Sequence, residues 1–160
     1  MSYMLYLLSS ERTITGVDYD QQKIETANNC YSKTDNISFI AEDVMQFPVE
    51  GYDVIIISDV LHYLSPVQQA ELLEKCFSGI NKGGRIIIRD GNAEMKKEHR
   101  WTKLTEFFST KLFRFNKSVQ ELNFMDAQTI KNKASRHNLS VEIDSDSKLT
   151  SNVIFVIKSA

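Results

Sequence analysis

The sequence predicts an α/β fold with a mostly parallel sheet, helices on both faces and an antiparallel strand near the C-terminus. Three observations carry this prediction. Strand-like segments alternate with segments of helical periodicity, and this order needs crossover connections between parallel strands. The stretch YDVIIISDVLHYL at 52–64 contains an unbroken run of β-branched residues. Two strand-like segments separated by a polar link close the chain, which is typical of a hairpin.

The most buried strand is expected at Val54–Ile57, where β-branched residues follow one another without a break. Such a run is typical of a strand that is covered on both faces, whereas an amphipathic surface strand alternates polar and apolar residues. Polar residues begin where the run stops, at Ser58, Asp59, His62 and Tyr63. Open α/β sheets bind their ligands at the carboxyl ends of strands. We therefore expect the functional site here.

The first part of the chain is expected to form a helix at 1–10, a strand at 12–17, a second helix and a strand at 37–41. Asp20 is a suitable N-cap for the second helix. The apolar face of that helix is predicted from i, i+3 and i+7 spacing to contain Ile24, Ala27 and Tyr31.

The best-marked helix begins after Ser65, which can act as an N-cap in a capping box with Gln68, and Pro66 suits the first helical position. Gly83 and Gly84 are expected to end it, ahead of a buried strand at 85–89. Its predicted apolar face comprises Val67, Ala70, Leu73, Phe77 and Ile80.

The remainder of the chain is expected to contain a helical segment at 94–117, a further helix and two strands. Asp126 can cap the further helix and Asn138 suits its C-terminal end. The strands are predicted at 139–143 and 153–157. The turn-rich link between them is long enough for a hairpin.

Composition points to one globular domain over residues 1–160, with 42% hydrophobic and 25% charged residues. The net charge of -2 gives no global attraction to nucleic acid or to an anionic membrane. No apolar stretch is long enough to span a bilayer and no signal peptide is evident, so a cytoplasmic location is expected. Cys30 and Cys76 have no metal-ligand spacing. We interpret both as reduced, packed thiols, and we expect no metal.

Five segments in order resemble the class I S-adenosylmethionine-dependent methyltransferases. They are ITGVDYD, FIAEDVMQFP, YDVIIISDVLHYL, INKGGRIIIRD and SNVIFVIK. Each motif alone is weak, because an acid after a strand is common in nucleotide-binding sheets, but together they are fairly specific. The resemblance covers the whole chain. It implies a Rossmann-like fold, S-adenosylmethionine as the cofactor and S-adenosylhomocysteine as its product.

The resemblance also implies roles for four residues near the first two strands. Asp18 matches the acid that holds the ribose hydroxyls, and a carboxylate suits a diol because it offers only acceptors. Tyr19 can lay its ring against adenine. Asp43 matches the residue that accepts from the adenine amino group, and the backbone N–H of Val44 would serve a ring nitrogen. The competing interpretation of both acids is a helix cap or a turn.

Beyond the central strand, Ser58 and Asp59 match positions that line the methionine end of the cofactor and the entrance for the acceptor. Methyl transfer is an in-line displacement, so alignment and exclusion of water can supply most of the catalysis. A base is needed only when the acceptor must lose a proton. His62 is the best-placed candidate, although a histidine here can also simply bond the backbone. Tyr63 is expected in the acceptor pocket.

The chain departs from that family at its front, where the family has a strand and a glycine-rich turn that hold the methionine moiety. No pair of glycines before the strand at 12–17 makes such a turn. The missing strand would lie between the strands that end at Asp18 and Ser58, which would leave two edges unpaired. A start at an internal methionine, exchange of elements in a homo-oligomer, and a non-catalytic remnant are the three explanations. We favour the first.

Residues 95–117 interleave basic and aromatic side chains. In the family this region often covers the acceptor, and as a lid it would favour an acidic, lipid-like or carrier-bound acceptor or a membrane surface. An amphipathic helix that packs its aromatic residues on the sheet is the simpler interpretation. No nucleic-acid reading motif accompanies the charge.

The predicted function is methyl transfer from S-adenosylmethionine to a small-molecule acceptor, without nucleic acid or stable membrane insertion. A catalytically silent domain used for protein association is one alternative. A nicotinamide-dependent dehydrogenase domain is another, because such a domain also places an acid after a strand.

Overall fold

The computed structural model describes residues 1–91, 126–144 and 152–159, and these form two compact units, Met1–Pro48 and Val49–Ala160. Each unit is described by itself below. The single domain expected over 1–160 stays a prediction. The helical segment expected at 94–117 lies outside the described residues.

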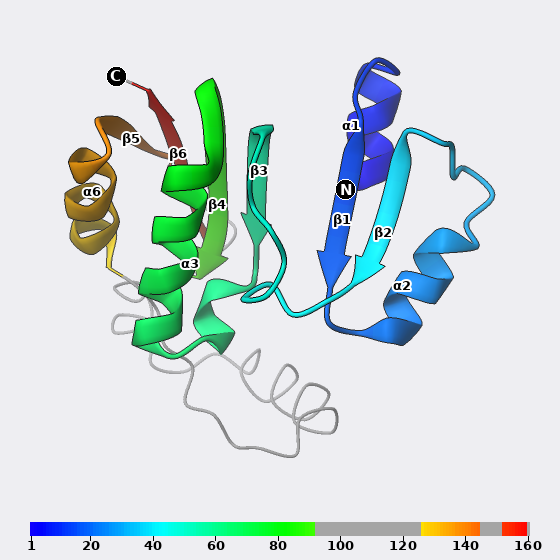
Figure 1. Cartoon of the computed structure of the whole chain (residues 1–160), viewed down its shortest axis with the longest axis horizontal. Helices are drawn as coiled ribbons and strands as arrows, with labels where there is room; N and C mark the ends of the chain where they lie inside the picture. The colour runs from blue at the N-terminus through cyan, green and yellow to red at the C-terminus, as the bar shows by residue number, and fades with distance from the viewer. Residues whose placement is uncertain (92–125, 145–151, 160) are drawn as a thin grey trace. The chain divides into compact units, whose positions relative to one another are not determined.

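The first unit contains a two-stranded parallel sheet, drawn in blue and cyan in Figure 1. Strand β1 (Ile14–Asp18) pairs with β2 (Ile37–Ala41). The register places Asp18 opposite Ala41. Both strands end at the same edge of the sheet because they are parallel. Helices α1 (Ser2–Leu8) and α2 (Gln21–Asn28) complete the unit.

Helix α2 begins where the sequence predicts. The Asp20 side chain accepts the backbone N–H groups of Gln22 and Lys23 at 3.0 and 3.2 Å, which satisfies two of the helix's open donors. Ile24 is buried, but Tyr31 is fully exposed beyond the helix end. Tyr31 was therefore wrongly predicted as part of the apolar face, because α2 ends at Asn28 before the third repeat of the pattern.

Helix α1 contacts the first sheet through Tyr3. Its ring lies 5.8 Å from that of Phe39, and its hydroxyl donates to the carbonyl oxygen of Ala27 at 2.7 Å. Met4, Leu7 and Leu8 are exposed, whereas Leu5 and Tyr6 are half-buried. Tyr3 thus gives α1 one polar and one aromatic contact with the rest of its unit.

The second unit is built on a four-stranded mixed sheet in the order β3-β4-β6-β5. Strands β3 (Tyr52–Ser58) and β4 (Ile80–Gly91) are parallel, and β6 (Asn152–Ser159) runs antiparallel to both β4 and β5 (Leu139–Asp144). The 3₁₀ turn η1 (Leu61–Tyr63) and helices α3 (Pro66–Gly79) and α6 (Ala127–Arg136) complete the unit. The predicted α/β fold with an antiparallel C-terminal strand is confirmed.

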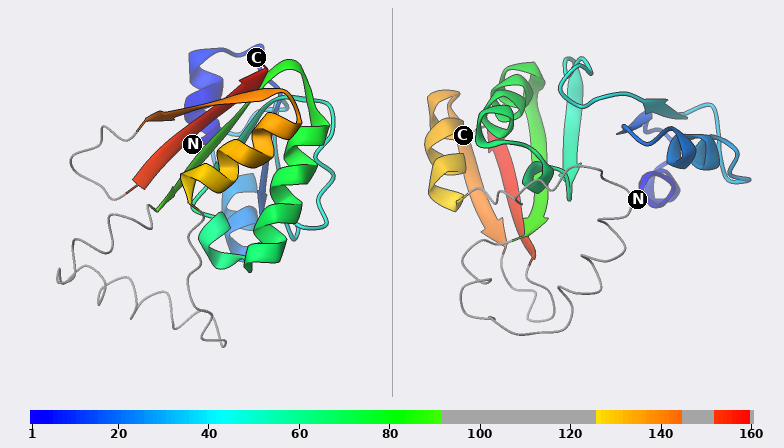
Figure 2. Two further views of the ribbon diagram at one scale, coloured as in Figure 1. Left: turned by 90° about the vertical axis from the view of Figure 1, so that its left-hand side faces the viewer. Right: turned by 90° about the horizontal axis from the view of Figure 1, so that it is seen from below.

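Helices α3 and α6 cover the same face of this sheet, as the two views of Figure 2 show. The core lies between them and the sheet, where Ile86 pairs with Ile157 and Ile88 with Phe155. Between the helices, His137 Nε2 lies 2.7 Å from Glu74 Oε2 and Lys133 Nζ lies 3.3 Å from Glu74 Oε1. The contact with His137, followed by that with Lys133, lowers the pKa of Glu74. The core residues of the helices are Leu72, Leu73, Cys76, Phe77, Ile130 and Ala134.

Strand β3 is less buried than its sequence predicts. Ile57 is buried, but Val54 is 50% exposed and Ile55 and Ile56 are half-buried. The physical reason is position: within the described residues β3 has one neighbour, β4, and so lies at the edge of its sheet. Strand β1 likewise has one neighbour, β2, in that part of the chain. An apolar strand at a sheet edge is unusual, because edges normally carry charges or bulges that prevent further pairing.

Helix α3 keeps the predicted start and changes the predicted end. The capping box of Ser65 and Gln68 is present. The helix ends at Gly79, and β4 already begins at Ile80. A Cβ atom at Gly79 would lie 1.6 Å from the carbonyl oxygen of Val49, so only glycine fits this contact. Gly83 and Gly84 were therefore wrongly predicted to end the helix, since both lie within β4.

The buried face of α3 is also rotated from the predicted one. Val67 is 66% exposed, and Ile80 belongs to β4. Leu73 and Phe77 are buried as predicted. The apolar stripe runs through the end of the helix that packs on β4, so the first turn remains in contact with solvent.

Helix α6 agrees closely with the prediction. Asp126 caps it by accepting the backbone N–H of Thr129 at 2.9 Å. Asn138 follows the C-cap residue His137 and has a φ of 56°, in the left-handed region that asparagine tolerates well. No helix within the described residues is both long enough and apolar enough to cross a membrane.

Replacement of Leu73 by alanine should destabilise the protein by about 2–5 kcal/mol, because the fully buried side chain leaves a cavity. Val67→Ala, on the same helix but exposed, should change stability by less than about 0.5 kcal/mol. Urea unfolding of both variants measures the difference. Equal losses in the two variants would contradict the observed rotation of the helix.

The two cysteines should differ in reactivity. Burial raises the pKa of Cys76 to about 12, whereas a hydrogen bond from the Ser32 backbone, and then side-chain hydrogen bonding with Tyr3, lowers the pKa of the half-exposed Cys30. Cys30 is thus not the packed thiol that we expected. Alkylation of the folded chain at mildly alkaline pH should label Cys30, since the thiolate is the reactive form, and should spare Cys76 until the chain unfolds. Mass spectrometry locates the label, and labelling of Cys76 in the folded chain would contradict its burial.

Candidate functional site

In the first unit, Asp18 ends β1 with its carboxylate held in place. Its Oδ1 accepts the backbone N–H of Asp20 at 2.9 Å, and Lys23 Nζ lies 3.5 Å from its Oδ2. The side chain is 36% exposed. The turn that was the competing interpretation of Asp18 is therefore present, but each carboxylate oxygen has more than one lone pair and can accept further hydrogen bonds.

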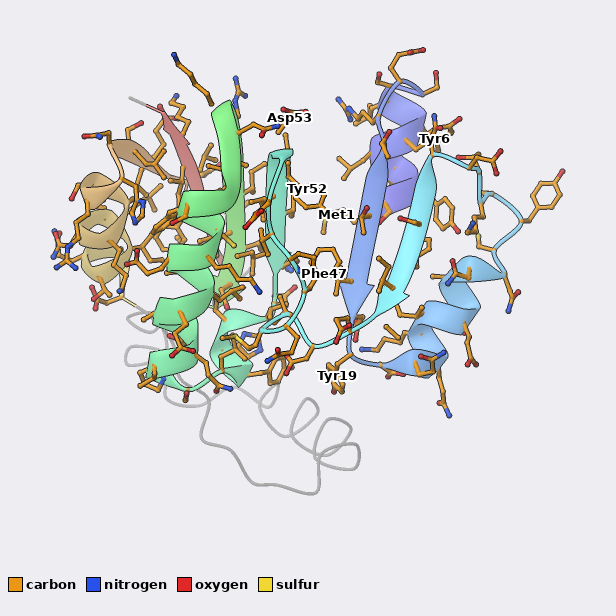
Figure 3. The ribbon with its side chains drawn as sticks, in the orientation of Figure 1. Met1, Tyr6, Tyr19, Phe47, Tyr52 and Asp53 are labelled. Atoms are coloured by element: carbon orange, nitrogen blue, oxygen red, sulfur yellow. The ribbon has the colours of Figure 1, made fainter. Side chains whose placement is uncertain are left out.

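Tyr19 follows directly and its ring is largely exposed. Figure 3 shows it beyond the arrowhead of β1, at the carboxyl end of the strand. A flat, exposed ring next to a carboxylate at a strand end can stack on a planar ligand.

Asp43 lies two residues beyond β2, at the same edge of the first sheet as Asp18. Its Oδ1 accepts the backbone N–H of Met45 at 2.9 Å, and its carbonyl oxygen accepts those of Gln46 and Phe47 at 2.8 and 3.0 Å. The residue is exposed and Val44 is half-buried. Asp43 thus forms a turn, as its competing interpretation predicted, while its side chain remains in contact with solvent.

The donor and acceptor chemistry of this edge fits the adenosine part of S-adenosylmethionine. A vicinal diol donates two hydrogen bonds and an exocyclic amine donates two more, so acceptor-only carboxylates are suitable partners for both. Asp18, with a partly exposed side chain, and Asp43, which is exposed, are carboxylates at one strand edge. The first unit therefore contains the acceptors that an adenosine moiety requires.

In the second unit, Ser58 is the last residue of β3 and Asp59 follows it, and both interact with β4. Ser58 lies opposite Arg89, and the Asp59 backbone N–H donates to the carbonyl oxygen of Arg89 at 2.9 Å. The Asp59 carboxylate accepts from Ser58 Oγ at 3.1 Å and forms an ion pair with the Arg89 guanidinium. Asp59 has a φ of 57°, in the left-handed region. Aspartate, like asparagine, adopts this region more readily than most residues with a side chain, and residues other than glycine that are held there cluster at functional sites.

His62 lies on η1, three residues further along, and contacts Asp90 at the end of β4. Its Nδ1 is 2.5 Å from Asp90 Oδ1, and its backbone N–H donates to Asp90 Oδ2 at 3.1 Å. The side chains of His62 and Asp90 are 13% and 10% exposed. The Tyr63 ring lies 4.1 Å from the imidazole, with 46° between the ring planes.

A buried glutamine on α3 holds the turn that carries His62. Gln69 Nε2 donates to the carbonyl oxygens of Leu61 and Leu64 at 2.8 and 3.1 Å. Leu61 itself is buried. The turn is therefore anchored by its backbone as well as by an apolar side chain, and the imidazole is attached to a rigid support.

The structure thus gathers the predicted residues into two sets. Strand pairing brings Asp18 and Asp43 to one edge in the first unit, and Ser58, Asp59 and His62 follow β3 in the second. Sequence reasoning missed Arg89 and Asp90, which are the direct partners of Asp59 and His62. Both residues could have been found from the two predicted strands. In a parallel sheet, the residues at the end of one strand lie next to those at the end of its neighbour. Among the described residues, no group of three or more His, Cys, Asp or Glu could hold a metal ion.

Solved methyltransferases share this fold. Human N-acetylserotonin methyltransferase in complex with SAM is 18% identical, with a TM-score of 0.69 over 99% of this chain and 44% of that chain. N-methyltransferase NodS from Bradyrhizobium japonicum WM9 in complex with S-adenosyl-L-homocysteine is 16% identical, with a TM-score of 0.66 over 97% of this chain and 71% of that chain. The fold is therefore that of the class I methyltransferases.

The chain belongs to the Methyltransferase domain family, whose sequence profile matches residues 1–143. The predicted family is thereby confirmed, and the match assigns the chain to the methyltransferases rather than to the nicotinamide-dependent dehydrogenases. S-adenosylmethionine and its demethylated product are the ligands in the two similar complexes, in agreement with the predicted cofactor.

Two similar curated proteins are named carboxy-S-adenosyl-L-methionine synthase. That of Campylobacter fetus subsp. fetus (strain 82-40) is 26% identical over 87 residues, which are 54% of this chain and 37% of the relative. That of Actinobacillus succinogenes is 30% identical over 81 residues, which are 49% of this chain and 34% of the relative. The matches thus span little more than a third of the length of these relatives.

The left-handed backbone of Asp59 gives a test of local strain. Asp59→Gly should be more stable than Asp59→Ala by about 1 kcal/mol, because glycine adopts a positive φ without a steric penalty. Both variants lose the same carboxylate and its ion pair with Arg89, so the comparison isolates the backbone. Thermal unfolding measures it, and an alanine variant as stable as the glycine variant would contradict the strain.

Proposed function

We propose that this chain binds S-adenosylmethionine and transfers its methyl group to a small-molecule acceptor. The observation that carries the proposal is the partly exposed Asp18 carboxylate at the carboxyl end of β1, in a chain that belongs to the Methyltransferase domain family. Open α/β sheets bind nucleotide-like ligands at this position of the fold.

The residues of the first unit bind the adenosine moiety. Asp18 accepts hydrogen bonds from the ribose hydroxyls, and Asp43 accepts from the adenine amino group. The Tyr19 ring stacks on the base. The backbone N–H of Val44 donates to a ring nitrogen. Each role uses a group that lies at the carboxyl edge of the first sheet.

The residues of the second unit serve the methionine end and the acceptor. When bound, S-adenosylmethionine supplies a methyl group on a positively charged sulfur, which an acceptor atom attacks in line. Ser58 and Asp59 line this end of the cofactor, and Tyr63 contributes to the acceptor pocket. His62 takes up the proton of an acceptor that must lose one, since an imidazole exchanges protons near neutral pH.

Replacement of Asp18 by alanine should weaken the binding of S-adenosylhomocysteine by about 10–100-fold, because a charged acceptor of two hydroxyl groups is lost. Calorimetric titration of the 160-residue chain measures the affinity without turnover. Asp35→Ala is the matched control, since Asp35 is an exposed acid of the same unit that has no proposed contact with the ligand.

Equal affinities of the Asp18→Ala and Asp35→Ala variants would contradict the ribose role of Asp18. The absence of binding even after upstream residues that supply the glycine-rich turn are restored would favour the catalytically silent domain that serves protein association. Binding without transfer to any molecule in an acceptor screen would favour the same alternative.

The similar proteins named carboxy-S-adenosyl-L-methionine synthase support a second candidate function. In that case the methyl carbon of the cofactor loses a proton and forms a bond to the carboxyl carbon of a carboxylic acid donor. The donor's carbon–carbon bond breaks with its electron pair on the donor, which takes up the proton. Mass spectrometry of S-adenosylmethionine incubated with the chain and a small-molecule cell extract separates the two. Methyl transfer yields S-adenosylhomocysteine, whereas carboxylation yields a cofactor that is heavier by one carboxyl group in place of a hydrogen.

A further inference from the structure

We propose that Asp90 is a positioning residue that keeps His62 in the tautomer with a proton on Nδ1, so that Nε2 is the nitrogen that accepts a proton from the methyl acceptor. This inference rests on the proposed function, in which His62 accepts a proton, and it names the ring nitrogen that does so.

The contacts between the two residues use both carboxylate oxygens. Oδ1 of Asp90 faces the imidazole Nδ1 at 2.5 Å, and Oδ2 accepts the backbone N–H of His62 at 3.1 Å. A carboxylate offers acceptors and no donor, so the nitrogen that faces it must carry the proton. In a neutral imidazole the other nitrogen, Nε2, is then unprotonated.

Burial strengthens this preference. The side chains are 10% exposed for Asp90 and 13% for His62, so little water is available to replace either partner. In such surroundings an unpaired carboxylate or a mismatched tautomer costs more than it does at the surface. The pair therefore has one favourable arrangement.

The backbone of η1 prevents the imidazole from moving away. Gln69 bonds the carbonyl oxygens on both sides of His62, those of Leu61 and Leu64. Asp90 itself bonds the His62 main chain as well as its ring. Asp90 thus fixes the position of the ring through two contacts with His62, one to the ring and one to the backbone. A surface ion pair between two side chains lacks the backbone contact.

The location of Asp90 suits a role in proton transfer. It is the last but one residue of β4 and directly follows Arg89, which lies opposite Ser58 at the end of β3. The carboxyl ends of these two parallel strands are where the acceptor is expected. As the acceptor forms its bond to the methyl carbon, the carbon–sulfur bond breaks with its electron pair on sulfur. The acceptor's proton passes to Nε2, and the resulting imidazolium charge lies next to Asp90.

The chain contains a second histidine and carboxylate pair that serves as a comparison. His137 Nε2 lies 2.7 Å from Glu74 Oε2, but this pair joins α6 to α3, and its side chains are more exposed than those of His62 and Asp90. It uses Nε2 rather than Nδ1. Glu74→Gln therefore removes a similar contact in the same unit without changing the surroundings of His62.

Nitrogen-15 NMR of the imidazole ring tests the proposal without an acceptor. The spectrum distinguishes a protonated from an unprotonated ring nitrogen. The unsubstituted chain should show His62 with a proton on Nδ1 and none on Nε2 when the ring is neutral. Asp90→Asn should reverse this, because an amide can donate to Nδ1 and so favours the tautomer with a proton on Nε2. Glu74→Gln should leave the His62 signals unchanged.

A proton on Nε2 in the neutral ring of the unsubstituted chain would overturn the proposal, and this measurement needs no variant to fold. An unchanged tautomer in a folded Asp90→Asn variant would overturn it as well. Once an acceptor is identified, Asp90→Asn should lower kcat by about 10²–10⁴-fold, the usual contribution of a general base, while S-adenosylhomocysteine binding persists. The two proposals can fail separately. If His62 carries its proton on Nδ1 but the chain binds no S-adenosylhomocysteine, the proposed function is refuted, whereas the proposal that Asp90 sets the tautomer stands.

Discussion

The candidate site in the second unit depends on the parallel pairing of β3 with β4. The register places Ser58 opposite Arg89, so the turn that follows β3 lies next to Asp90. Side chains alternate between the two faces of a strand. If the pairing of β4 with β3 shifted by one residue, Arg89 would take the place of Asp90 on the face covered by the helices. The contact between His62 and Asp90 would then be lost. The buried isoleucines of both strands favour the observed register, because the same slip would expose them.

Three local interactions stabilise the segment that connects β3 to β4. The capping box of Ser65 starts α3 immediately after η1, Gln69 bonds the backbone of η1 from within the helix, and Gly79 allows the helix end to contact Val49. The capping box stabilises the start of the helix itself, whereas Gln69 and Gly79 join α3 to neighbouring segments. Helix α3 therefore supports the candidate base His62 as well as covering the sheet. This explains a buried glutamine in an otherwise apolar stripe, since its amide has two carbonyl partners.

The sequence was sufficient for features that depend on local chemistry. Caps such as Asp20, Ser65 and Asp126 were predicted because their hydrogen bonds reach two or three residues along the chain. It was insufficient for features that depend on distant partners. The exposure of Val54 follows from the place of β3 in the sheet, and the pairing of Asp90 with His62 joins residues 28 apart in the chain. Neither feature can be predicted from the local pattern of apolar residues.

Asp18 and Asp90 show how one residue type can suit two different roles at similar positions in two sheets. Each ends or nearly ends a parallel strand within its own sheet. The Asp18 side chain is 36% exposed and bonds the backbone of its own turn and Lys23, so solvent or a ligand can reach its oxygens. The Asp90 side chain is 10% exposed and bonds both the ring and the backbone of His62. An exposed carboxylate can exchange water for a ligand, whereas a buried one has its partners built in. Burial therefore separates the carboxylate suited to binding from the one suited to positioning.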